Sequence, residues 1–285
     1  MCCWIPIAPH LARPENTRLV WGPQAYNRDM LAFDWIAEIQ ERYGRTLTLP
    51  EIRKGVVALS RIYVEERRRI ERGAAFDGAG KRAAFACFYS PLHFLLVREI
   101  VSALGAEREP PRRIFDLGCG LAVAGAAWAT HCERRPRVVG YEKSSWAADE
   151  ARWLLATLEI AGRIHQKPLQ EAPPAGRGDA VVAAYAVNEL DARGRARFLD
   201  RLLEAGEREA SVLVVEPLAR RTSPWWPEWR EEFLEASGRA DEWRFAVELP
   251  PSLALLDRAS GLDHRELTAR SLYLRGAAVA ALDSL

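Results

Sequence analysis

The residues best suited to chemistry in this 285-residue chain lie in the segment Asp116-Leu117-Gly118-Cys119-Gly120. It follows the apolar run Arg113–Leu117 and precedes an alanine- and valine-rich stretch, which indicates a turn between a buried strand and a helix. Glycine is needed where a backbone takes a positive φ or comes close to a ligand. Ligands of open α/β sheets bind at the carboxyl ends of strands, where this turn lies. We therefore expect a small-molecule site formed by Asp116, Gly118, Cys119 and Gly120.

The neighbouring residues indicate which kind of ligand this turn binds. A dinucleotide-binding turn would carry a third glycine at position 123, to let a helix end approach a pyrophosphate, and this chain has Val123 there. Glu142 ends the next apolar run, twenty-two residues after Gly120, and can accept hydrogen bonds from both ribose hydroxyls. S-adenosylmethionine carries a ribose, an ammonium and a sulfonium but no phosphate, and Asp116 suits the ammonium. We therefore predict this cofactor, with further contacts from Lys143, Gln166 and Ala184. The ordinary alternative is a βα turn with a solvated acid at the second strand end.

A second group of polar residues follows the fourth apolar run, Asp179–Val187. Methyl transfer is an in-line displacement that needs a positioned nucleophile and sometimes a base. We expect Asn188 to hold an amine or hydroxyl of the acceptor and Glu189 to orient it or accept its proton, with Tyr185 as a pocket wall. The alternatives are that Asn188 caps a turn, that Glu189 is solvated and that Tyr185 belongs to the core.

The fifth apolar run ends in Val215-Glu216-Pro217, another acid at a carboxyl edge, and three tryptophans follow it. Trp225, Trp226 and Trp229 could cover the acceptor or stack on a base. Alternatively, and we favour this slightly, they anchor the next helix.

The elements that must position these residues follow from hydrophobic periodicity. Short apolar runs alternate with amphipathic segments such as Ser145–Leu158 and Ala192–Ala205, which predicts an α/β fold with a parallel sheet covered on both faces. No strong helix separates the last two runs, so we expect them to form an antiparallel closing pair. The predicted strands are Arg113–Leu117, Arg137–Glu142, Arg163–Lys167, Asp179–Val187, Ser211–Glu216, Trp243–Leu249 and Ser271–Ala278.

The first hundred or so residues have helical patterns instead. We expect a helix from Arg28 to Tyr43, and a second one that starts at a capping box in which Thr48 is the N-cap and Glu51 reaches back. A third helix is expected to begin with Ser90 as N-cap and Pro91 in its first turn, and to end at Gly105. Because the charged stretch 106–112 contains two prolines, we predict a helical domain over 1–108 and a cofactor-binding domain over 109–285.

From about Arg113 to the C-terminus the chain resembles class I S-adenosylmethionine-dependent methyltransferases. Asp116-Leu117-Gly118-Cys119-Gly120 is similar to their first motif and Glu142 to their ribose-binding acid. The resemblance implies a Rossmann-like sheet, mostly parallel with an antiparallel last strand, behind an N-terminal helical domain. Many members carry an acid after the third strand that contacts the adenine. This chain has none there, and Gln166, Gln170 or a backbone group could replace it.

Shorter segments resemble one branch of that class, the methyltransferase-like proteins of the bacterial and mitochondrial small ribosomal subunit. They are Leu59–Tyr63, Lys81–Ala86, Asn188-Glu189-Leu190, Val215-Glu216-Pro217 and Arg270–Leu274. The branch binds an iron–sulfur cluster through four cysteines, several of them after the Glu-Pro pair, whereas this chain has no cysteine after Cys132. We therefore expect no metal cluster.

Composition limits the partners. With 40 basic and 39 acidic side chains the net charge is +1, which gives no global attraction to nucleic acid or an anionic membrane. A local patch of arginines between Arg61 and Arg72, joined by Lys81 and Arg82, keeps RNA as an expected partner. No apolar run approaches the roughly 20 residues of a membrane span, and five scattered cysteines indicate a reducing, cytoplasmic environment.

Three functions remain open at this stage. The first is an active methyltransferase that acts on ribosomal RNA or a partner in the small ribosomal subunit. The second is a methyltransferase for a small molecule or peptide, which would have a buried pocket beside Asn188. The third is a ribosome-assembly factor without catalytic activity.

Overall fold

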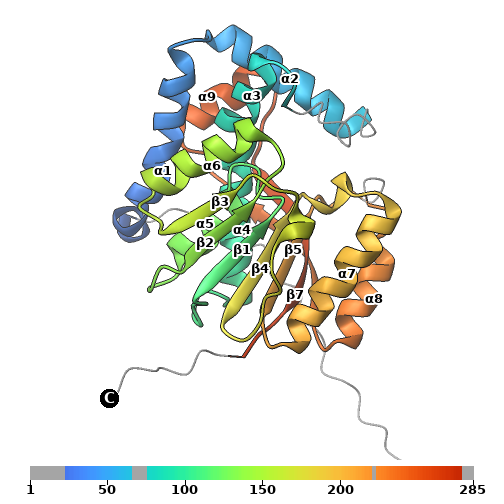
Figure 1. Ribbon diagram of the computed structural model, residues 1–285. Coiled ribbons are helices and arrows are strands. Elements are labelled where there is room, and N and C mark those ends of the chain that lie inside the picture. Colours follow the sequence, from blue (N-terminus) through green and yellow to red (C-terminus); the bar gives the residue numbers. More distant parts are fainter. Residues whose placement is uncertain (1–22, 66–75, 220–222, 278–285) are drawn as a thin grey trace, which may run out of the picture.

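A seven-stranded sheet forms the centre of the molecule (Figure 1). The computed structural model describes residues 23–65, 76–219 and 223–277, and within them the strand order is β3-β2-β1-β4-β5-β7-β6. The strands are β1 Arg113–Leu117, β2 Arg137–Tyr141, β3 Gly162–His165, β4 Asp179–Ala184, β5 Ser211–Glu216, β6 Arg239–Ala246 and β7 Glu266–Leu274.

The direction of the strands confirms the predicted Rossmann-like sheet. Strands β1 to β5 pair in parallel, whereas β7 runs antiparallel to both β5 and β6. The chain leaves β1 toward β2 and β3 and then returns to place β4 on the other side of β1. This reversal makes the carboxyl ends of β1 and β4 the point where such sheets open a ligand crevice.

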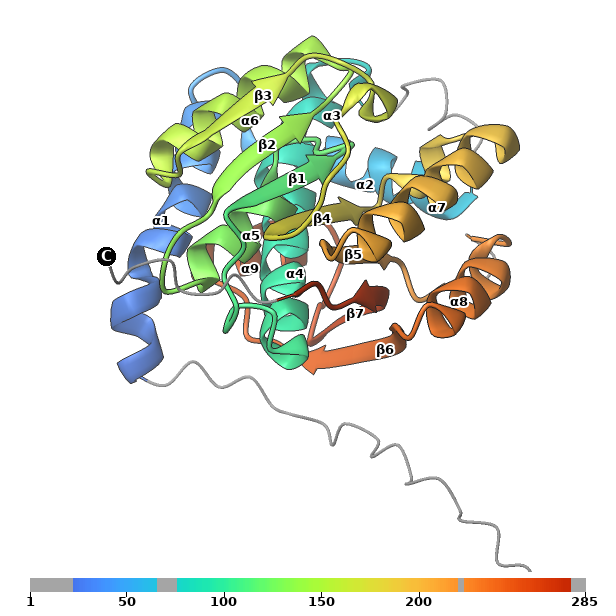
Figure 2. The same cartoon turned by 60° about the horizontal axis from the view of Figure 1, so that its bottom comes forward.

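Helices cover both faces of the sheet (Figure 2). Helices α1, α2, α4, α5, α6 and α9 contribute to a hydrophobic cluster on one face, and α7 and α8 to a second cluster on the other. The bounds are α1 Pro23–Gly44, α2 Leu49–Glu65, α3 Ala79–Ala84, α4 Ser90–Leu104, α5 Val123–His131, α6 Ser145–Thr157, α7 Ala192–Glu207, α8 Trp226–Glu235 and α9 Pro251–Ala259, with short turns η3 Phe85–Tyr89, η4 Leu169–Glu171 and η5 Val187–Glu189.

The N-terminal helices share their core with the cofactor half of the chain. The first cluster runs without a break from Trp35 and Val56 through Phe94 to Trp128 on α5. Helix α1 is also held to α6 by polar contacts, because Arg42 and Tyr43 both bond to the buried carboxylate of Glu150. The domain boundary expected at 106–112 stays a prediction, and across it the two parts are packed on each other.

Two of the predicted helix starts have different outcomes. The helix starts after Thr48 as predicted and Glu51 reaches back, since the backbone N–H of Thr48 donates to Glu51 Oε2 at 2.7 Å. The other half of the capping box is not formed, because the Thr48 hydroxyl donates to the same Glu51 oxygen. Ser90 as an N-cap is wrong: it is buried and helical, and the helix continues from α3 through the π-helical turn η3 into α4. Pro91 is tolerated because the wider turn before it absorbs the lost N–H and the clash with the preceding turn. The expected end is confirmed, with Gly105 left-handed at φ 66°.

The strand predictions differ most toward the C-terminus. Strand β4 ends at Ala184 rather than Val187, because Tyr185 takes a positive φ of 59° and η5 follows. Strand β6 begins at Arg239 and β7 at Glu266, both earlier than predicted, and α9 lies between them, where we expected no strong helix. Both strands begin with polar residues mixed among the apolar ones, exposed or half-buried in β6 and largely buried in β7, and a search for apolar runs therefore missed their beginnings.

Among the described residues, one helix is long and apolar enough to cross a membrane by length and composition. It is the continuous stretch Ala79–Leu104 formed by α3, η3 and α4, and 78% of its most apolar part is buried inside the protein. That burial is expected of a core helix.

Close packing of α2 on α3 gives a test of the N-terminal fold. A Cβ on Gly55 would lie 2.1 Å from the carbonyl oxygen of Gly80, so a methyl group there must push the helices apart. We expect Gly55→Ala to lower the free energy of unfolding by about 1–3 kcal/mol in chemical denaturation. Gly80→Ala is the matched control, since its Cβ would meet nothing nearer than 3.7 Å. Equal stability of the two variants would contradict this packing.

Candidate functional site

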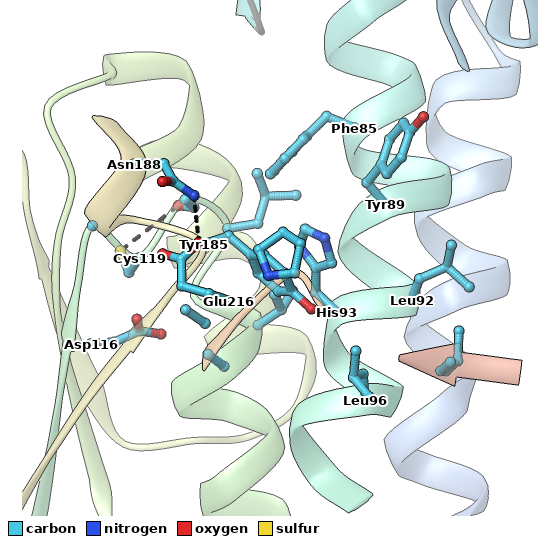
Figure 3. Close-up of a pocket in the computed structure, with 18 of the residues that line it drawn as sticks. Phe85, Tyr89, Leu92, His93, Leu96, Asp116, Cys119, Tyr185, Asn188 and Glu216 are labelled. Atoms are coloured by element: carbon cyan, nitrogen blue, oxygen red, sulfur yellow. Dashed lines mark hydrogen bonds between the residues drawn. The ribbon is translucent and has the colours of Figure 1, made fainter. Parts of the chain in front are cut away.

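A cavity among the described residues opens at the carboxyl edge of the sheet, beside the ends of β1 and β4 (Figure 3). Its volume is about 330 Å³. The sheet edge contributes the glycine turn, Glu142 and the ends of β4 and β5. Side chains of η3 and α4 form the opposite wall, and residues around the start of β7 complete it. The cavity therefore combines the predicted cofactor turn with a chamber bounded by the N-terminal helices.

The glycine turn is bonded to the neighbouring strand. The backbone N–H groups of Gly118 and Cys119 both donate to the carbonyl oxygen of Tyr141, at 3.0 and 3.1 Å. Gly118 has a φ of 72°, and a Cβ on it would lie 2.7 Å from the Cβ of Ala186. The turn therefore needs glycine there for its conformation and for the close approach of the loop after β4.

Cys119 lines the cavity and also fills the space beneath β2. A Cβ on Gly140 would lie 2.8 Å from its Sγ atom. Burial raises the pKa of this thiol well above its ordinary value, with Asp116 and Glu142 adding to the effect, so the thiol is protonated at neutral pH. Cys119 is thus a small packing residue at the cavity wall.

Asp116 and Glu142 bring two buried carboxylates to the cavity. Asp116 Oδ2 accepts the N–H of Gly125 in α5 at 2.8 Å. Glu142 accepts the N–H of Gly120 at 3.0 Å and that of Ser144 at 2.7 Å. Asp116 is 1% exposed and Glu142 is 7% exposed, and neither carboxylate forms an ion pair within the described part of the chain. The structure therefore buries two carboxylates here whose hydrogen bonds come from backbone amides, with the charge of Lys143 helping Glu142 from a distance.

The pKa values show the cost of this arrangement. Burial raises the pKa of Asp116 from 3.8 to about 7; the Gly125 amide opposes the rise and the charge of Glu142 adds to it. Burial likewise raises the pKa of Glu142, against the amides of Ser144 and Gly120. Both carboxylates would be stabilised by a cationic ligand.

Asn188 lies at the cavity, and its amide is engaged within the protein. Its Nδ2 donates to Glu216 Oε2 at 2.6 Å and to Ser223 at 3.3 Å, and its Oδ1 accepts from Trp225 Nε1 at 3.0 Å. Glu216 is fully buried and also accepts the N–H of Val187. The side chain expected to hold the acceptor thus holds the end of β5 and the tryptophan segment in place, with one lone pair of its oxygen left.

The three tryptophans lie away from the cavity. Trp225, Trp226 and Trp229, at and within the start of α8, are buried in the second hydrophobic cluster together with residues of α7. Trp225 lies 4.6 Å from Trp229, ring centroid to centroid. The interpretation that they anchor the next helix agrees with this arrangement.

Tyr185 projects into the cavity and stacks on a residue that the sequence did not indicate. Its ring lies 3.9 Å from the imidazole of His93 on α4, at an interplanar angle of 19°. Burial lowers the pKa of His93 to about 3, so the imidazole is neutral. A lone histidine in an apolar helix offers no signal of its own, and only the packing of α4 over the sheet edge brings it here.

The remaining predicted residues divide into two groups. Ala184 and Glu189 line the cavity. Lys143 and Gln166 are outside its lining: Lys143 pairs with Glu189 at 3.0 Å, and Gln166 is exposed on the loop after β3. The adenine contact from Gln166 therefore stays a prediction.

The predicted basic patch falls mostly outside the described residues, which exclude 66–75. Of its described members, Arg61 is exposed, Lys81 pairs with Asp77, and Arg82 donates to the carbonyl oxygen of Phe76 and lies over the Trp146 ring. Among the described residues no group of three or more histidine, cysteine or acidic side chains is placed to hold a metal ion. Cys2 and Cys3 lie outside the described part.

Comparison with known proteins identifies no family for this chain. No protein-family model matches the chain, and no curated protein matches it. Solved structures similar to it include the plantazolicin methyltransferase BpumL in complex with SAH, with 12% identity, 84% of this chain and 99% of that chain covered, and a TM-score of 0.47.

Two further structures are magnesium protoporphyrin IX methyltransferase from Synechocystis PCC 6803 and a protein provisionally assigned as an RNA methyltransferase from Pyrococcus horikoshii. The first has 13% identity, 78% and 97% of the two chains covered and a TM-score of 0.45. The second has 14% identity, 65% of this chain and 84% of that chain covered, and a TM-score of 0.43. At this level of likeness nothing follows about the substrate of the present chain.

Neutralising Asp116 tests the buried charge. A pKa raised on folding means that the folded state holds a proton that the unfolded state releases, so wild-type stability falls as pH rises from about 4 to about 7. Asp116→Asn cannot ionise, so it does not lose stability in this way. We expect the unfolding free energy of this variant to exceed that of wild type by an amount that grows over this pH range and reaches on the order of 2–4 kcal/mol at pH 8. Denaturant titrations at several pH values measure the difference.

Asp179→Asn is the contrast for that experiment. Asp179 is also buried but pairs with Arg113 at 2.9 Å, so its neutralisation should destabilise the protein at pH 8. A difference between Asp116→Asn and wild type that does not change with pH would contradict the account of Asp116.

Removing the Asn188 side chain tests its internal role. Asn188→Ala takes one hydrogen-bond partner each from the buried Glu216 carboxylate and the Trp225 indole, so we expect a loss of about 1–3 kcal/mol in unfolding free energy. Glu189→Gln breaks only a surface pair with Lys143 and should cost at most about 1 kcal/mol. If Asn188→Ala were as stable as Glu189→Gln, the side chain would not anchor this loop.

Proposed function

We propose that this protein is an S-adenosylmethionine-dependent methyltransferase that acts on a small molecule held in an enclosed chamber. The observation that carries the proposal is the pair of buried carboxylates, Asp116 and Glu142, that face the cavity without a basic partner. A ligand that carries positive charge relieves their burial, whereas one that carries phosphates adds to it.

The donor set agrees with the groups of this cofactor. Glu142 directly follows β2 and already accepts two backbone N–H groups, which fix the carboxylate and leave lone pairs for ribose hydroxyls. Asp116 is the last but one residue of β1, just before the glycine turn, and would face the ammonium. Val123 stands at the start of α5 where a dinucleotide turn needs glycine, and a pyrophosphate there would lie beside two carboxylates. The same residues thus favour a cationic nucleoside and disfavour a nicotinamide dinucleotide.

The chemistry that this cofactor supplies is an electrophilic methyl group on sulfur. The protein's own contribution is then to bind, orient and desolvate the acceptor. Tyr185 and His93 form a stacked pair at the cavity, and Asn188 keeps Glu216 and the loop after β4 in position. In this proposal Asn188 acts on the acceptor mainly by holding the loop that borders it.

The shape of the cavity supports a small-molecule acceptor over ribosomal RNA. Its volume of about 330 Å³ falls in the range of small-ligand pockets. The wall opposite the glycine turn consists of side chains from one continuous helix, among them Phe85, Tyr89 and Leu96 (Figure 3). A nucleobase inside RNA would have to leave its stack and enter this chamber. Ribosomal RNA stays a prediction from the sequence, and most of the arginines that suggested it, between residues 66 and 75, lie outside the described residues.

Binding calorimetry tests the cofactor. We expect micromolar-range binding of S-adenosylmethionine and of S-adenosylhomocysteine, with little affinity for NAD. Asp116→Asn and Glu142→Gln should each weaken binding by about 1.5–3 kcal/mol, because a charged hydrogen bond is lost. Glu171→Gln removes an exposed carboxylate that pairs with Lys167 and should bind like wild type.

Two results would overturn the proposal. Unchanged affinity in both site variants would show that the cofactor, if bound, lies elsewhere. Binding of NAD in preference to S-adenosylmethionine would show that the buried carboxylates do not select a cationic ligand. Radiolabelled methyl transfer to RNA and to small-molecule extracts, measured in parallel, then decides between the two acceptor classes.

A further inference from the structure

The cavity contains a second histidine, whose environment differs from that of His93. His264 lines the chamber just before β7, and its Nδ1 lies 2.6 Å from Oδ1 of Asp257 on α9. Asp257 is 3% exposed and also accepts the backbone N–H of His264 through Oδ2, at 2.8 Å. One carboxylate therefore orients both the backbone and the ring of the same residue.

This contact sets the chemistry of the ring. A carboxylate accepts hydrogen bonds, so Nδ1 carries the proton and Nε2 keeps a lone pair in the neutral imidazole. Within the described residues no hydrogen bond to Nε2 is recorded, and the side chain is 33% exposed. The arrangement is that of a base held by a third group: an imidazole nitrogen available to a ligand, with a buried carboxylate behind it.

The sheet register places this pair at the reacting end of the cavity. Glu216, the last residue of β5, pairs with Arg270 of β7. Because β7 is antiparallel, its residues before Arg270 continue past the end of β5, over the carboxyl edge of the sheet. His264 thus lies beyond the same strand end that carries Glu216, and Leu267 and Thr268 extend the cavity wall between them.

The two histidines of the chamber are suited to different tasks. His93 is buried against Tyr185 and has no carboxylate bonded to its ring in the described structure, so a positive charge on it is costly. His264 instead has a carboxylate oxygen of Asp257 at 2.6 Å from its ring Nδ1. When two titratable groups share a site but have such different surroundings, the difference is the usual basis for assigning an acid or a base.

We propose that His264, oriented by Asp257, is the general base that deprotonates the methyl acceptor, and that the acceptor is a neutral aromatic compound bearing a phenol-like hydroxyl. The inference rests on the proposed methyltransferase function and names its substrate class. Aromatic side chains on the chamber wall, Phe76, Phe85 and Tyr89, suit a planar ring.

The charges around the chamber favour a hydroxyl over an amine or a carboxylate. At the acceptor end each carboxylate is already engaged: Glu216 with Asn188 and the Val187 amide, Glu189 with Lys143, and Glu266 with Arg244. An acceptor that carries an ammonium group would find no unengaged carboxylate among them. An acceptor that carries a carboxylate would be repelled by their negative charge. A neutral hydroxyl avoids both penalties but must lose its proton to become a strong nucleophile.

The step balances without any further reagent. The acceptor hydroxyl gives its proton to His264 Nε2, and its oxygen forms a bond to the methyl carbon. The carbon–sulfur bond breaks with its electron pair on sulfur, which leaves a neutral thioether. The imidazolium, held by Asp257, then releases the proton to water. General base catalysis of this kind contributes about 10²–10⁴ in rate.

A chromogenic phenol tests the base without turnover. The probe is 4-nitrophenol, whose ionised form is yellow and whose neutral form is colourless, added to protein saturated with S-adenosylhomocysteine. We expect wild type to lower the pH midpoint of its ionisation by about 1–3 pH units, because proton transfer to His264 leaves an ion pair with the phenolate. His264→Gln and Asp257→Asn should each lose this shift.

Other titratable and charged groups face His264 and could move the midpoint, so a matched control is needed. They are Asp257 on α9, Asp263 and Arg265 beside it, Glu266 with Arg244, Glu216 at the end of β5, and Tyr89 and His93 on the opposite wall. Asp263→Asn neutralises an aspartate next to His264 that pairs with Arg265, and should keep the wild-type shift.

Calorimetry with S-adenosylhomocysteine separates the two proposals. If wild type does not bind S-adenosylhomocysteine, the proposed methyltransferase function itself is overturned. Cofactor binding with no effect of wild type on 4-nitrophenol, or an equal shift in His264→Gln, would overturn only the assignment of the base and its phenol-like acceptor. Asp257 also accepts the backbone N–H of His264, so its replacement can disturb the fold. The result of a variant is therefore used only if that variant binds S-adenosylhomocysteine like wild type. His264→Asn is the second variant should His264→Gln fail this check.

Discussion

The burial of two carboxylates without a basic partner is the constraint on which the site depends. Asp116 and Glu142 lie within one residue of the ends of the neighbouring parallel strands β1 and β2, so the register of these strands brings them to one edge. Backbone amides of Gly120, Gly125 and Ser144 bond to them, which explains why the turn must be tight and why α5 must start where it does. These amides offset part of the desolvation cost, and the raised pKa of Asp116 shows the part that remains.

The N-terminal helices turn an open crevice into a chamber. In a bare Rossmann-like sheet the carboxyl edge faces solvent, whereas here the helix through η3 and α4 lies across it and contributes His93, Tyr89 and Leu96 to the cavity. The π-helical turn before Pro91 keeps that helix continuous, so these three side chains come from one unbroken helix. Strand β7 adds the third side because it runs past the end of β5. The chamber therefore depends on packing between segments far apart in the chain.

This dependence explains what could be predicted from the sequence. Asp116, the glycines and Glu142 lie within one local strand–turn–strand pattern, and the structure brings them together at the predicted edge. His93 and His264 carry no local signal, since one lies in an apolar helix and the other in a polar connection whose strand begins earlier than its apolar run. Asn188 was expected at the cavity and lies there, but its hydrogen bonds to Glu216 and Trp225 depend on a tertiary contact that no spacing reveals. Ser90 was misinterpreted because a Ser-Pro pair resembles a helix start even where a π-helical turn carries the helix through it.

The central claim is that the buried carboxylates of this sheet edge hold a cationic nucleoside. The most direct measurement is a crystal structure of the protein with S-adenosylhomocysteine. The account predicts density in this cavity, with both ribose hydroxyls within hydrogen-bond distance of Glu142, the ammonium on the side of Asp116 and the sulfur directed toward Tyr185 and His93. Density for the nucleoside outside this cavity, or a ribose that makes no contact with Glu142, would contradict it.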